Sequence, residues 1–258
     1  MSDQEHSKYT DSSGVPWEGR SFGNNPYLGD SGLADEFLIS AIADFQTGAA
    51  GSEKVLEAFG RARLLIPLVA NLGEVGEGAH GQKVDKSAEL SIVTVLTPDN
   101  QKGLPVFSSV AAMTHWNPKA RPVPNLGSTV CLAAASEGNT RIVLDPTSDT
   151  EFVIRRPGIA AVAQNLPWLP PERNPEVVDL VNQSLTDQDF VDSFTLISGD
   201  PTHRLRGQEL VVVLYLQPGL EKAQLGLIEE AFFTKLSTSE RFVDLVDSVS
   251  VKFLPVEA

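Results

Sequence analysis

One short run of the chain, residues 104–116, constrains the fold more than any other segment. Its first part, Leu104-Pro105-Val106-Phe107, predicts a short buried strand, because apolar residues follow one another without a polar break. Ser108 or Ser109 then offers a hydroxyl that can accept from the free N–H groups of a first helical turn. The rest of the run has the apolar spacing of an amphipathic helix, and the proline-rich residues 117–124 predict a loop after it.

Helical and strand patterns recur along the chain in two groups, residues 31–165 and residues 174–258. Each group predicts two strands, a helix and a further strand, with additional helices. The fold class predicted is therefore α+β: two small units, each an antiparallel or mixed sheet with helices packed on one face. Residues 166–173 predict a proline-rich linker, because prolines interrupt regular structure. Residues 1–30 predict a disordered acidic tail, since they are mostly polar.

The first folded unit is predicted to begin with a helix. Apolar residues recur at helical spacing from Leu33 through Phe37 to Phe45, and Ser31 is a plausible N-cap in front of them. This pattern places Leu33 and Phe37 on the buried face of the helix.

Composition excludes several classes of partner and compartment. The formal net charge of −14 has the sign of nucleic acid and of anionic lipid, which disfavours both as general partners. The longest strongly apolar run, residues 210–216, is far shorter than the ~20 residues that span a bilayer, and the first thirty residues lack the apolar core of a secretory signal. The single cysteine, Cys131, permits no internal disulfide and lies in an apolar run that predicts a buried, inert thiol. We therefore expect a cytoplasmic protein.

Basic residues occur in four small pairs, and solvated surface is the ordinary interpretation of each. If several pairs converged in the fold, they would form one anion- or RNA-binding patch, and the sequence leaves this open. The pairs are Arg61 with Arg63, Lys119 with Arg121, Arg155 with Arg156, and Arg204 with Arg206.

Two glycine motifs match functional patterns without the structural context that the chemistry requires. Residues 19–23 read G-x-S-x-G, but no strand precedes them, so the sharp strand-to-helix turn of a nucleophile elbow is not expected. Residues 76–81 read G-x-G-x-x-G, but only residues 82–88 separate them from the next predicted strand, too few for the helix that binds a pyrophosphate. The four histidines are isolated, without metal-ligand spacing. We therefore predict no catalytic residue, no cofactor and no metal.

Acidic residues gather after one predicted strand, where Asp145, Asp149 and Glu151 lie close in sequence. Loops at strand ends often carry function, so a carboxylate- or metal-dependent hydrolase that uses Asp145 remains a third alternative. Solvated acidic surface is the simpler interpretation of the group.

Several short motifs together resemble the SseB-like family, which is named for enhanced serine sensitivity in bacteria. They are Leu104 to Met113, Trp116, Ala120-Arg121-Pro122-Val123-Pro124 and Val143-Leu144-Asp145-Pro146. The resemblance covers Leu33 to about Pro157 as the family's N-terminal domain and, more weakly, Phe190 to Leu254 as its C-terminal domain. It implies a small α+β cytoplasmic protein without assigned chemistry, so it supplies no catalytic residue.

The leading functional hypothesis is a non-enzymatic interaction or regulatory protein of unassigned pathway, with another protein as its partner. Aromatic residues beside turns and in the tail are the candidate contacts, because Trp and Tyr are favoured at interfaces. These candidates are Trp17, Phe22, Tyr27, Trp116 and Trp168. The alternative is a small-molecule binding or sensing protein, with an amino acid as a candidate ligand and a pocket between the two units near Trp168. The sequence carries no signal for an oligomeric state.

Overall fold

A computed structural model of the chain describes residues 27–71 and 89–256. The chain divides into two units, Met1–Ser31 and Gly32–Ala258, and every described helix and strand lies in the second. The two glycine motifs lie outside the described residues, as do Trp17 and Phe22.

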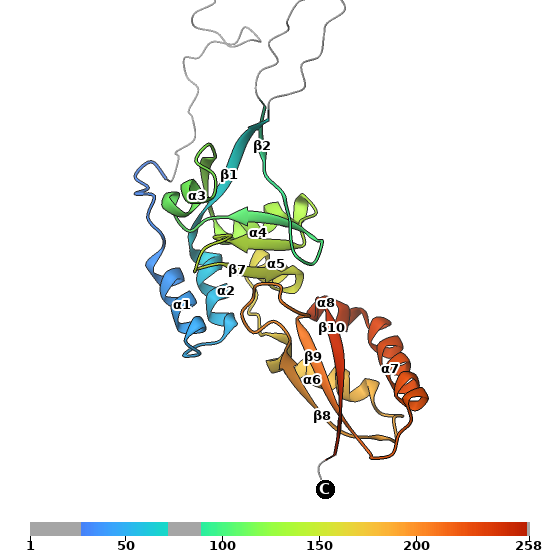
Figure 1. The fold of residues 1–258 in the computed structure, drawn as a ribbon. Helices are drawn as coiled ribbons and strands as arrows, with labels where there is room; N and C mark the ends of the chain where they lie inside the picture. Colours follow the sequence, from blue (N-terminus) through green and yellow to red (C-terminus); the bar gives the residue numbers. More distant parts are fainter. Residues whose placement is uncertain (1–26, 72–88, 257–258) are drawn as a thin grey trace, which may run out of the picture. The chain divides into compact units, whose positions relative to one another are not determined.

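Two stretches of the second unit correspond to the two predicted folded units, and we call them the N-terminal segment (residues 32–165) and the C-terminal segment (residues 174–256). The elements of the N-terminal segment are α1 (Glu36–Gln46), α2 (Ser52–Arg61), β1 (Arg63–Asn71), β2 (Glu89–Ile92), β3 (Val95–Leu96), β4 (Lys102–Val106), α3 (Val110–Trp116), β5 (Arg121–Leu126), α4 (Gly127–Ser136), β6 (Arg141–Leu144), β7 (Phe152–Arg155) and α5 (Arg156–Ala163) (Figure 1). Those of the C-terminal segment are α6 (Pro175–Ser184), β8 (Val191–Ser198), β9 (Leu210–Leu216), α7 (Lys222–Ser237), α8 (Glu240–Leu245) and β10 (Val249–Pro255), preceded by the short 3₁₀ helix η2 (Pro171–Arg173).

The main sheet of the N-terminal segment has the strand order β3-β4-β6-β7, with β4 and β6 parallel and the other pairs antiparallel. Side chains alternate between its two faces, as strand geometry requires. Ile142, Leu144 and Ile154 join the large core formed with α1, α2, α4 and α5. Val143 and Val153 point to the opposite face, where they contact Leu205 of the C-terminal segment.

The run that dominates the sequence adopts its predicted strand and helix. β4 leads through the buried Phe107 into α3, and the Ser109 hydroxyl accepts from the Ala112 N–H at 3.1 Å, so Ser109 is the N-cap. Ser108 has a different role, because it bonds to Asp145.

The proline-rich stretch after α3 is partly a strand, which corrects the predicted loop. β5 pairs antiparallel with β1 at one edge of the sheet β2-β1-β5, and Pro122 and Pro124 lie within it. An edge strand tolerates proline, because the missing N–H need not face a neighbouring strand. The proline content alone predicted a loop, because the strand that pairs with β5, β1, is far away in sequence.

The first helix also differs from its prediction. α1 begins at Glu36, and its N-cap is Asp35, whose carboxylate accepts from the Phe37 and Leu38 N–H groups at 3.0 and 3.1 Å. Leu38 and Ile42 are buried, whereas Leu33 and Phe37 are exposed, so the predicted cap and two of the predicted core positions were wrong. Two adjacent apolar residues, Phe37 and Leu38, left the periodicity ambiguous about which one faces the core.

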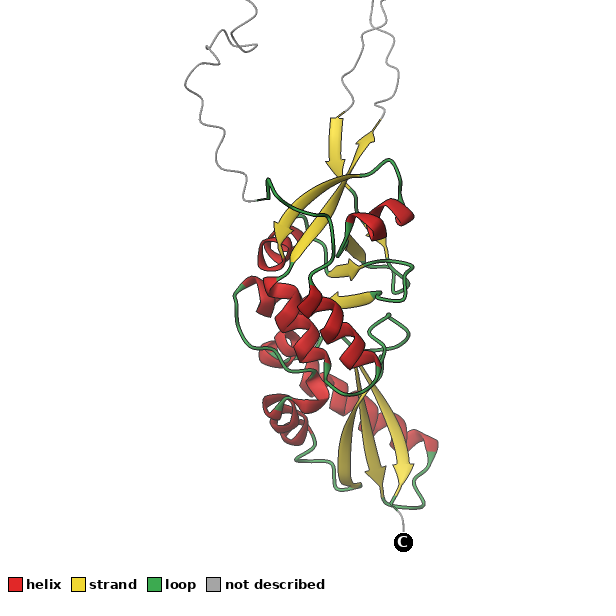
Figure 2. Ribbon diagram, turned by 90° about the vertical axis from the view of Figure 1, so that its left-hand side faces the viewer, coloured by secondary structure: helices red, strands yellow, loops and turns green. Residues whose placement is uncertain are grey.

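The C-terminal segment has its own hydrophobic core. Its sheet has the order β10-β9-β8, with β9 parallel to β10 and antiparallel to β8, and these are the three strands nearest the C-terminus in Figure 2. Alternate residues of β9, from Leu210 to Leu216, pack with side chains of α6, α7 and α8. Both segments therefore combine helices with mixed or antiparallel sheets, which confirms the α+β prediction. The domain boundary at residues 166–173 stays a prediction.

Within residues 27–71 and 89–256, no helix is both long and apolar enough to cross a membrane.

Candidate functional site

Two arginines project side by side from the main sheet toward the C-terminal segment. Arg141 at the start of β6 is paired directly with Arg155 at the end of β7, and both are only 5% exposed. Residues directly opposite in an antiparallel pair place their side chains on the same face, where like charges repel. Burial of both cations therefore requires carboxylates from elsewhere in the chain.

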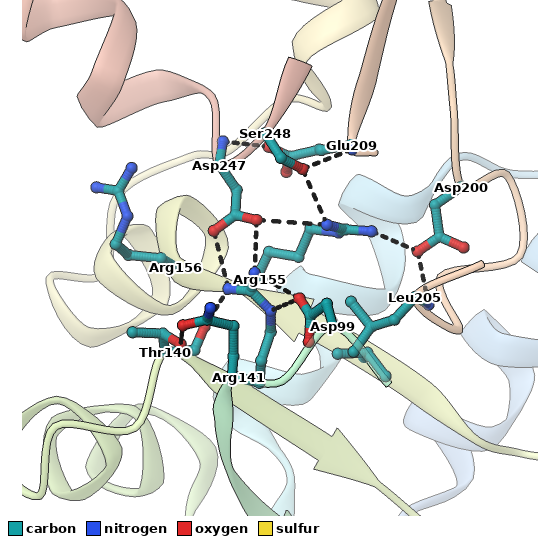
Figure 3. Close-up of polar contacts among 12 residues, drawn as sticks. Asp99, Thr140, Arg141, Arg155, Arg156, Asp200, Leu205, Glu209, Asp247 and Ser248 are labelled. Carbon is teal, nitrogen blue, oxygen red and sulfur yellow. Dashed lines mark hydrogen bonds and ion pairs between the residues drawn. The ribbon is translucent and has the colours of Figure 1, made fainter. Parts of the chain in front are cut away.

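Asp247, in the connection between α8 and β10, supplies the carboxylate between the two guanidinium groups (Figure 3). Its Oδ1 and Oδ2 accept from Nη1 and Nη2 of Arg141 at 2.8 and 2.7 Å. Its Oδ2 also accepts from Nη1 of Arg155 at 3.3 Å. One buried carboxylate thus pairs with both arginines and links the C-terminal segment to β6 and β7.

Asp99 completes the coordination of Arg141 from the tip of the β3–β4 hairpin. Its Oδ2 accepts from Nε and Nη2 of Arg141 at 2.9 and 2.8 Å, and the Thr140 carbonyl accepts from Nη1 at 2.8 Å. With the two bonds to Asp247, all five N–H donors of this guanidinium have an acceptor. Arg141 is therefore held rigidly, with no donor left for a ligand.

Asp200 holds Arg155 from the loop after β8. Its Oδ2 accepts from Nη2 of Arg155 and from the Leu205 N–H, both at 2.9 Å. Its Oδ1 accepts from the N–H groups of Arg204 and Arg206 at 3.2 and 3.1 Å. One buried carboxylate thereby shapes the loop and fixes it to β7.

Glu209 is a third buried acid of this cluster, and it is 6% exposed. Its Oε2 accepts from the Asp247 N–H at 2.6 Å, while its own N–H donates to the Ser248 hydroxyl at 3.0 Å. Burial, with a contribution from the Asp247 charge, raises the pKa of Glu209 to about 7, although the Asp247 N–H, Arg155 and Arg141 act in the opposite direction. We call Asp99, Arg141, Arg155, Asp200, Glu209 and Asp247 the charge cluster.

A polar cavity of about 510 Å³ opens beside the charge cluster. Arg156 and Arg206 line it in addition to Arg141 and Arg155, and Gln101, Gln208 and Ser248 contribute further polar groups. The predicted basic pairs thus converge only in part. Arg204 does not line this cavity, because its side chain is directed elsewhere: its Nη2 donates to the carbonyls of Ser148 and Asp149 at 3.1 and 3.0 Å.

A second pocket, of about 480 Å³, contains the predicted interaction residue Trp168. Its apolar wall is formed by Leu56 of α2, Val162 of α5 and the linker residues Leu166, Trp168 and Leu169. All lining residues come from 53–61 and 162–169. The pocket therefore lies on the N-terminal segment and the linker, and it is not the pocket between the two units that the sequence suggested. We call it the Trp168 groove.

His203 anchors the Asp200 loop in an aromatic cluster of the N-terminal segment. Its ring stacks on Phe152 with centroids 4.5 Å apart and meets Phe45 and Trp168 edge-on at 5.3 and 6.5 Å. Burial lowers the pKa of His203 to about 4, despite the opposing charge of Asp200. The imidazole is therefore neutral at physiological pH.

Trp116, another predicted interaction residue, lies against Phe107 with ring centroids 5.3 Å apart, in the small cluster around Leu65 and Met113. Tyr27 lies in a turn of the first unit, where its carbonyl accepts from the Asp30 N–H at 3.0 Å. Trp116 and Trp168 belong to different clusters, so the structure does not combine these two candidates into one site.

Asp145, the candidate hydrolase residue, is a buried anchor for the strand end that carries Ser108. Its Oδ1 accepts from the Ser108 N–H at 2.8 Å. Its Oδ2 accepts from the hydroxyls of Ser108 and Thr150 at 2.7 and 2.9 Å. Among the described residues, no group of three metal-ligating side chains could hold a metal ion. Cys131 is fully buried, and burial raises the pKa of its thiol to about 12.

Replacing Asp145 by alanine is expected to lower the free energy of unfolding by about 3 kcal/mol, because the buried Ser108 N–H loses a charged acceptor. Urea unfolding followed by circular dichroism measures this difference. The exposed neighbour Asp149 is the control, and its alanine variant should stay within ~0.5 kcal/mol of the parent. Equal stability of the two variants would contradict the anchoring role.

No local sequence pattern contains the charge cluster, because its members are spread from Asp99 to Asp247. A weak signal existed. Arg141 and Arg155 adjoin strands that are otherwise wholly apolar, Ile142-Val143-Leu144 and Phe152-Val153-Ile154. A charged residue that continues a buried strand is rarely exposed to solvent. It therefore indicates an oppositely charged partner inside the protein.

Comparison with known proteins agrees with this architecture. The N-terminal segment combines a mixed sheet with helices packed on one face of it. Residues 38–161 match the family model of the SseB protein N-terminal domain, so the chain contains that domain, and the resemblance noted in its sequence is confirmed there. The match ends before β8, so a family-type C-terminal domain stays a prediction. No curated protein and no solved structure matches the chain.

Proposed function

We propose that this protein is a cytoplasmic, non-enzymatic interaction or regulatory protein that binds a segment of another protein in the Trp168 groove. The observation that carries the proposal is the apolar surface of the linker. Leu166 and Leu169 are 56% and 40% exposed beside the partly buried Trp168. Exposed apolar side chains gathered at a hollow are typical of an interaction site.

The acids that line the groove are already paired within the protein. Glu53 and Glu57 of α2 lie at its rim, where Glu53 pairs with Arg173 at 3.1 Å and Glu57 pairs with Lys54 at 3.1 Å. Burial, with a contribution from the nearby Glu53 charge, raises the pKa of Glu172. Arg61, which also lines the groove, pairs with Glu57 at 3.4 Å. Cations therefore match the carboxylates along this edge, and an apolar side chain of the partner segment would be recognised by the apolar wall.

The acids that a hydrolase would use support the non-enzymatic interpretation. Asp145 is occupied by three hydrogen bonds, and Asp247 and Asp200 are paired with buried arginines. A general base needs a lone pair directed at a substrate proton. These carboxylates direct theirs at groups of the protein itself.

A substitution in the groove tests the proposal. Leu166→Glu is expected to weaken binding of the captured partner at least about tenfold, because a charge then lies against the apolar wall. Leu132→Glu is the matched control, since Leu132 is also 56% exposed but lies on α4, outside the groove. Tagged full-length protein is used to capture the partner, and its affinity for each purified variant is measured by calorimetry.

Equal loss of affinity in both variants, or in neither, would contradict the assignment of the groove. A chain that lacks residues 1–30 forms a further arm of the experiment. If only this deletion abolishes capture, the tail aromatics Trp17, Phe22 and Tyr27 carry the interaction and the groove does not.

A further inference from the structure

The polar cavity beside the charge cluster has the opposite charge from the chain as a whole. Four arginines line it, namely Arg141, Arg155, Arg156 and Arg206. Two acids, Asp99 and Asp247, line it with them, so the lining side chains carry a net charge of +2 in a chain of net charge −14, while Asp200 and Glu209 lie beside Arg155 without lining the cavity. A concave surface with low-dielectric walls focuses such a charge and attracts ions of opposite sign.

The four arginines have different tasks. Arg141 has all its donors bonded within the protein, and Arg155 donates to Asp200, Asp247, Ser248 and Gly207. Their charges are already balanced by Asp99, Asp200 and Asp247, and they have little hydrogen-bonding capacity left for a ligand.

Arg156 and Arg206 are the arginines with donors to spare. Arg206 is exposed, and no hydrogen bond or ion pair joins its guanidinium to another residue in the described part of the chain. Arg156 at the start of α5 uses only Nη2, which donates to the Val243 carbonyl and, at 3.5 Å, to that of Val246. A guanidinium presents five donors in a planar fork that suits carboxylate and phosphate groups.

We propose that this cavity binds a small organic anion, whose phosphate or carboxylate groups pair with Arg156 and Arg206. The volume of about 510 Å³ exceeds that of a single inorganic oxyanion and suits a metabolite-sized molecule. Gln101 and Gln208 also line the cavity and provide amide groups for its remaining polar atoms. The site goes beyond the proposed partner groove, because no residue lines both.

Titration calorimetry of the full chain with pyrophosphate and, separately, with citrate tests the proposal at constant ionic strength. At least one of the two probes is expected to bind one-to-one with a dissociation constant below about 1 mM. Binding of pyrophosphate alone identifies a phosphate site, and binding of citrate alone a carboxylate site. No heat from either probe at this concentration overturns the proposal.

Single substitutions then locate the bound anion. Arg206→Gln and Arg156→Gln are each expected to weaken binding about tenfold, because a charge-assisted pair of hydrogen bonds is lost. Arg121→Gln removes the same charge from the exposed edge strand β5, outside the cavity, and should leave the affinity unchanged. Circular dichroism confirms that each variant is folded. If all three variants bind equally well, or all three lose affinity equally, the anion is held elsewhere and the proposal fails.

Discussion

Replacing Arg155 by methionine is expected to lower the free energy of unfolding by about 3–5 kcal/mol. The substitution leaves the Asp200 and Asp247 carboxylates buried without one of their cations, at side-chain exposures of 3% and 6%. Methionine fills a similar volume, so the loss reports the missing charge and its hydrogen bonds more than a cavity. Urea unfolding at pH 7, monitored by circular dichroism, measures the difference.

The exposed pair of Arg241 and Glu176 provides the control. Their atoms are 2.6 Å apart, closer than those of Arg155 and Asp200 at 2.9 Å, but their side chains are 57% and 45% exposed. A solvated pair contributes below ~1 kcal/mol, so Arg241→Met should change little. If the two arginine variants lose the same stability, burial does not determine the strength of the cluster.

A double variant separates the loss of the pair from the cost of the unpaired acid. Adding Asp200→Asn to Arg155→Met removes one orphaned charge, although the amide keeps only one of the two acceptor oxygens that Asp200 uses. The double variant is therefore expected to be less destabilised than the sum of the two single variants. Strict additivity would show that Asp200 and Arg155 do not interact energetically.

Local signals predicted those elements whose ends are determined by neighbouring residues. Asn174 followed by Pro175 has the residue types of an N-cap and a first helical position, and in the structure the Asn174 side chain accepts from the Glu176 N–H at 3.0 Å, at the start of α6. Asn tolerates a left-handed backbone better than most residues, and Asn100, in the β3–β4 hairpin turn, has a φ of 59°. In both cases the cause of the structure lies within a few residues of its effect.

Long-range pairing explains what the sequence did not reveal. β5 is a strand only because β1 is beside it, with Leu65 opposite Pro124. Arg155 and Arg156 were treated as one basic pair on the surface. They are adjacent in sequence but separated in role, since Arg155 ends a buried strand and Arg156 begins α5. Arg155 is buried because it pairs with Asp247, which lies far away in sequence and belongs to no local pattern.

The Trp168 groove was predictable in part. The proline-rich linker marked Trp168 as a candidate contact, and Trp168 does line a pocket. The sequence did not show that α2 and α5 form the rest of that pocket, because their contact depends on core residues such as Leu56 and Val162. It gave no sign of His203, whose ring reaches Phe152 from the C-terminal segment.

Replacing Glu209 by glutamine is expected to stabilise the protein at pH 8 by about 3 kcal/mol. The pKa of Glu209 is about 7 in the folded chain, compared with 4.5 for the ordinary side chain. Between these two pH values the folded state binds more protons than the unfolded state, so the free energy of unfolding of the parent protein falls as pH rises. Glutamine resembles the neutral carboxyl group and can still accept from the Asp247 N–H.

The titration of His203 changes the free energy of unfolding in the opposite direction. The pH dependence of the parent protein alone therefore does not isolate the contribution of Glu209. The pKa of His203 is lowered from 6.5 to about 4, which makes stability increase with pH across that interval. The two slopes oppose each other between pH 4.5 and 6.5. The difference between Glu209→Gln and the parent, measured by urea unfolding from pH 4 to 8, cancels the His203 contribution. That difference should rise steadily from about pH 4.5 and level off above pH 7. A difference independent of pH would show that Glu209 ionises in the folded protein as readily as in water, and that the charge cluster stabilises its carboxylate enough to offset the cost of burial.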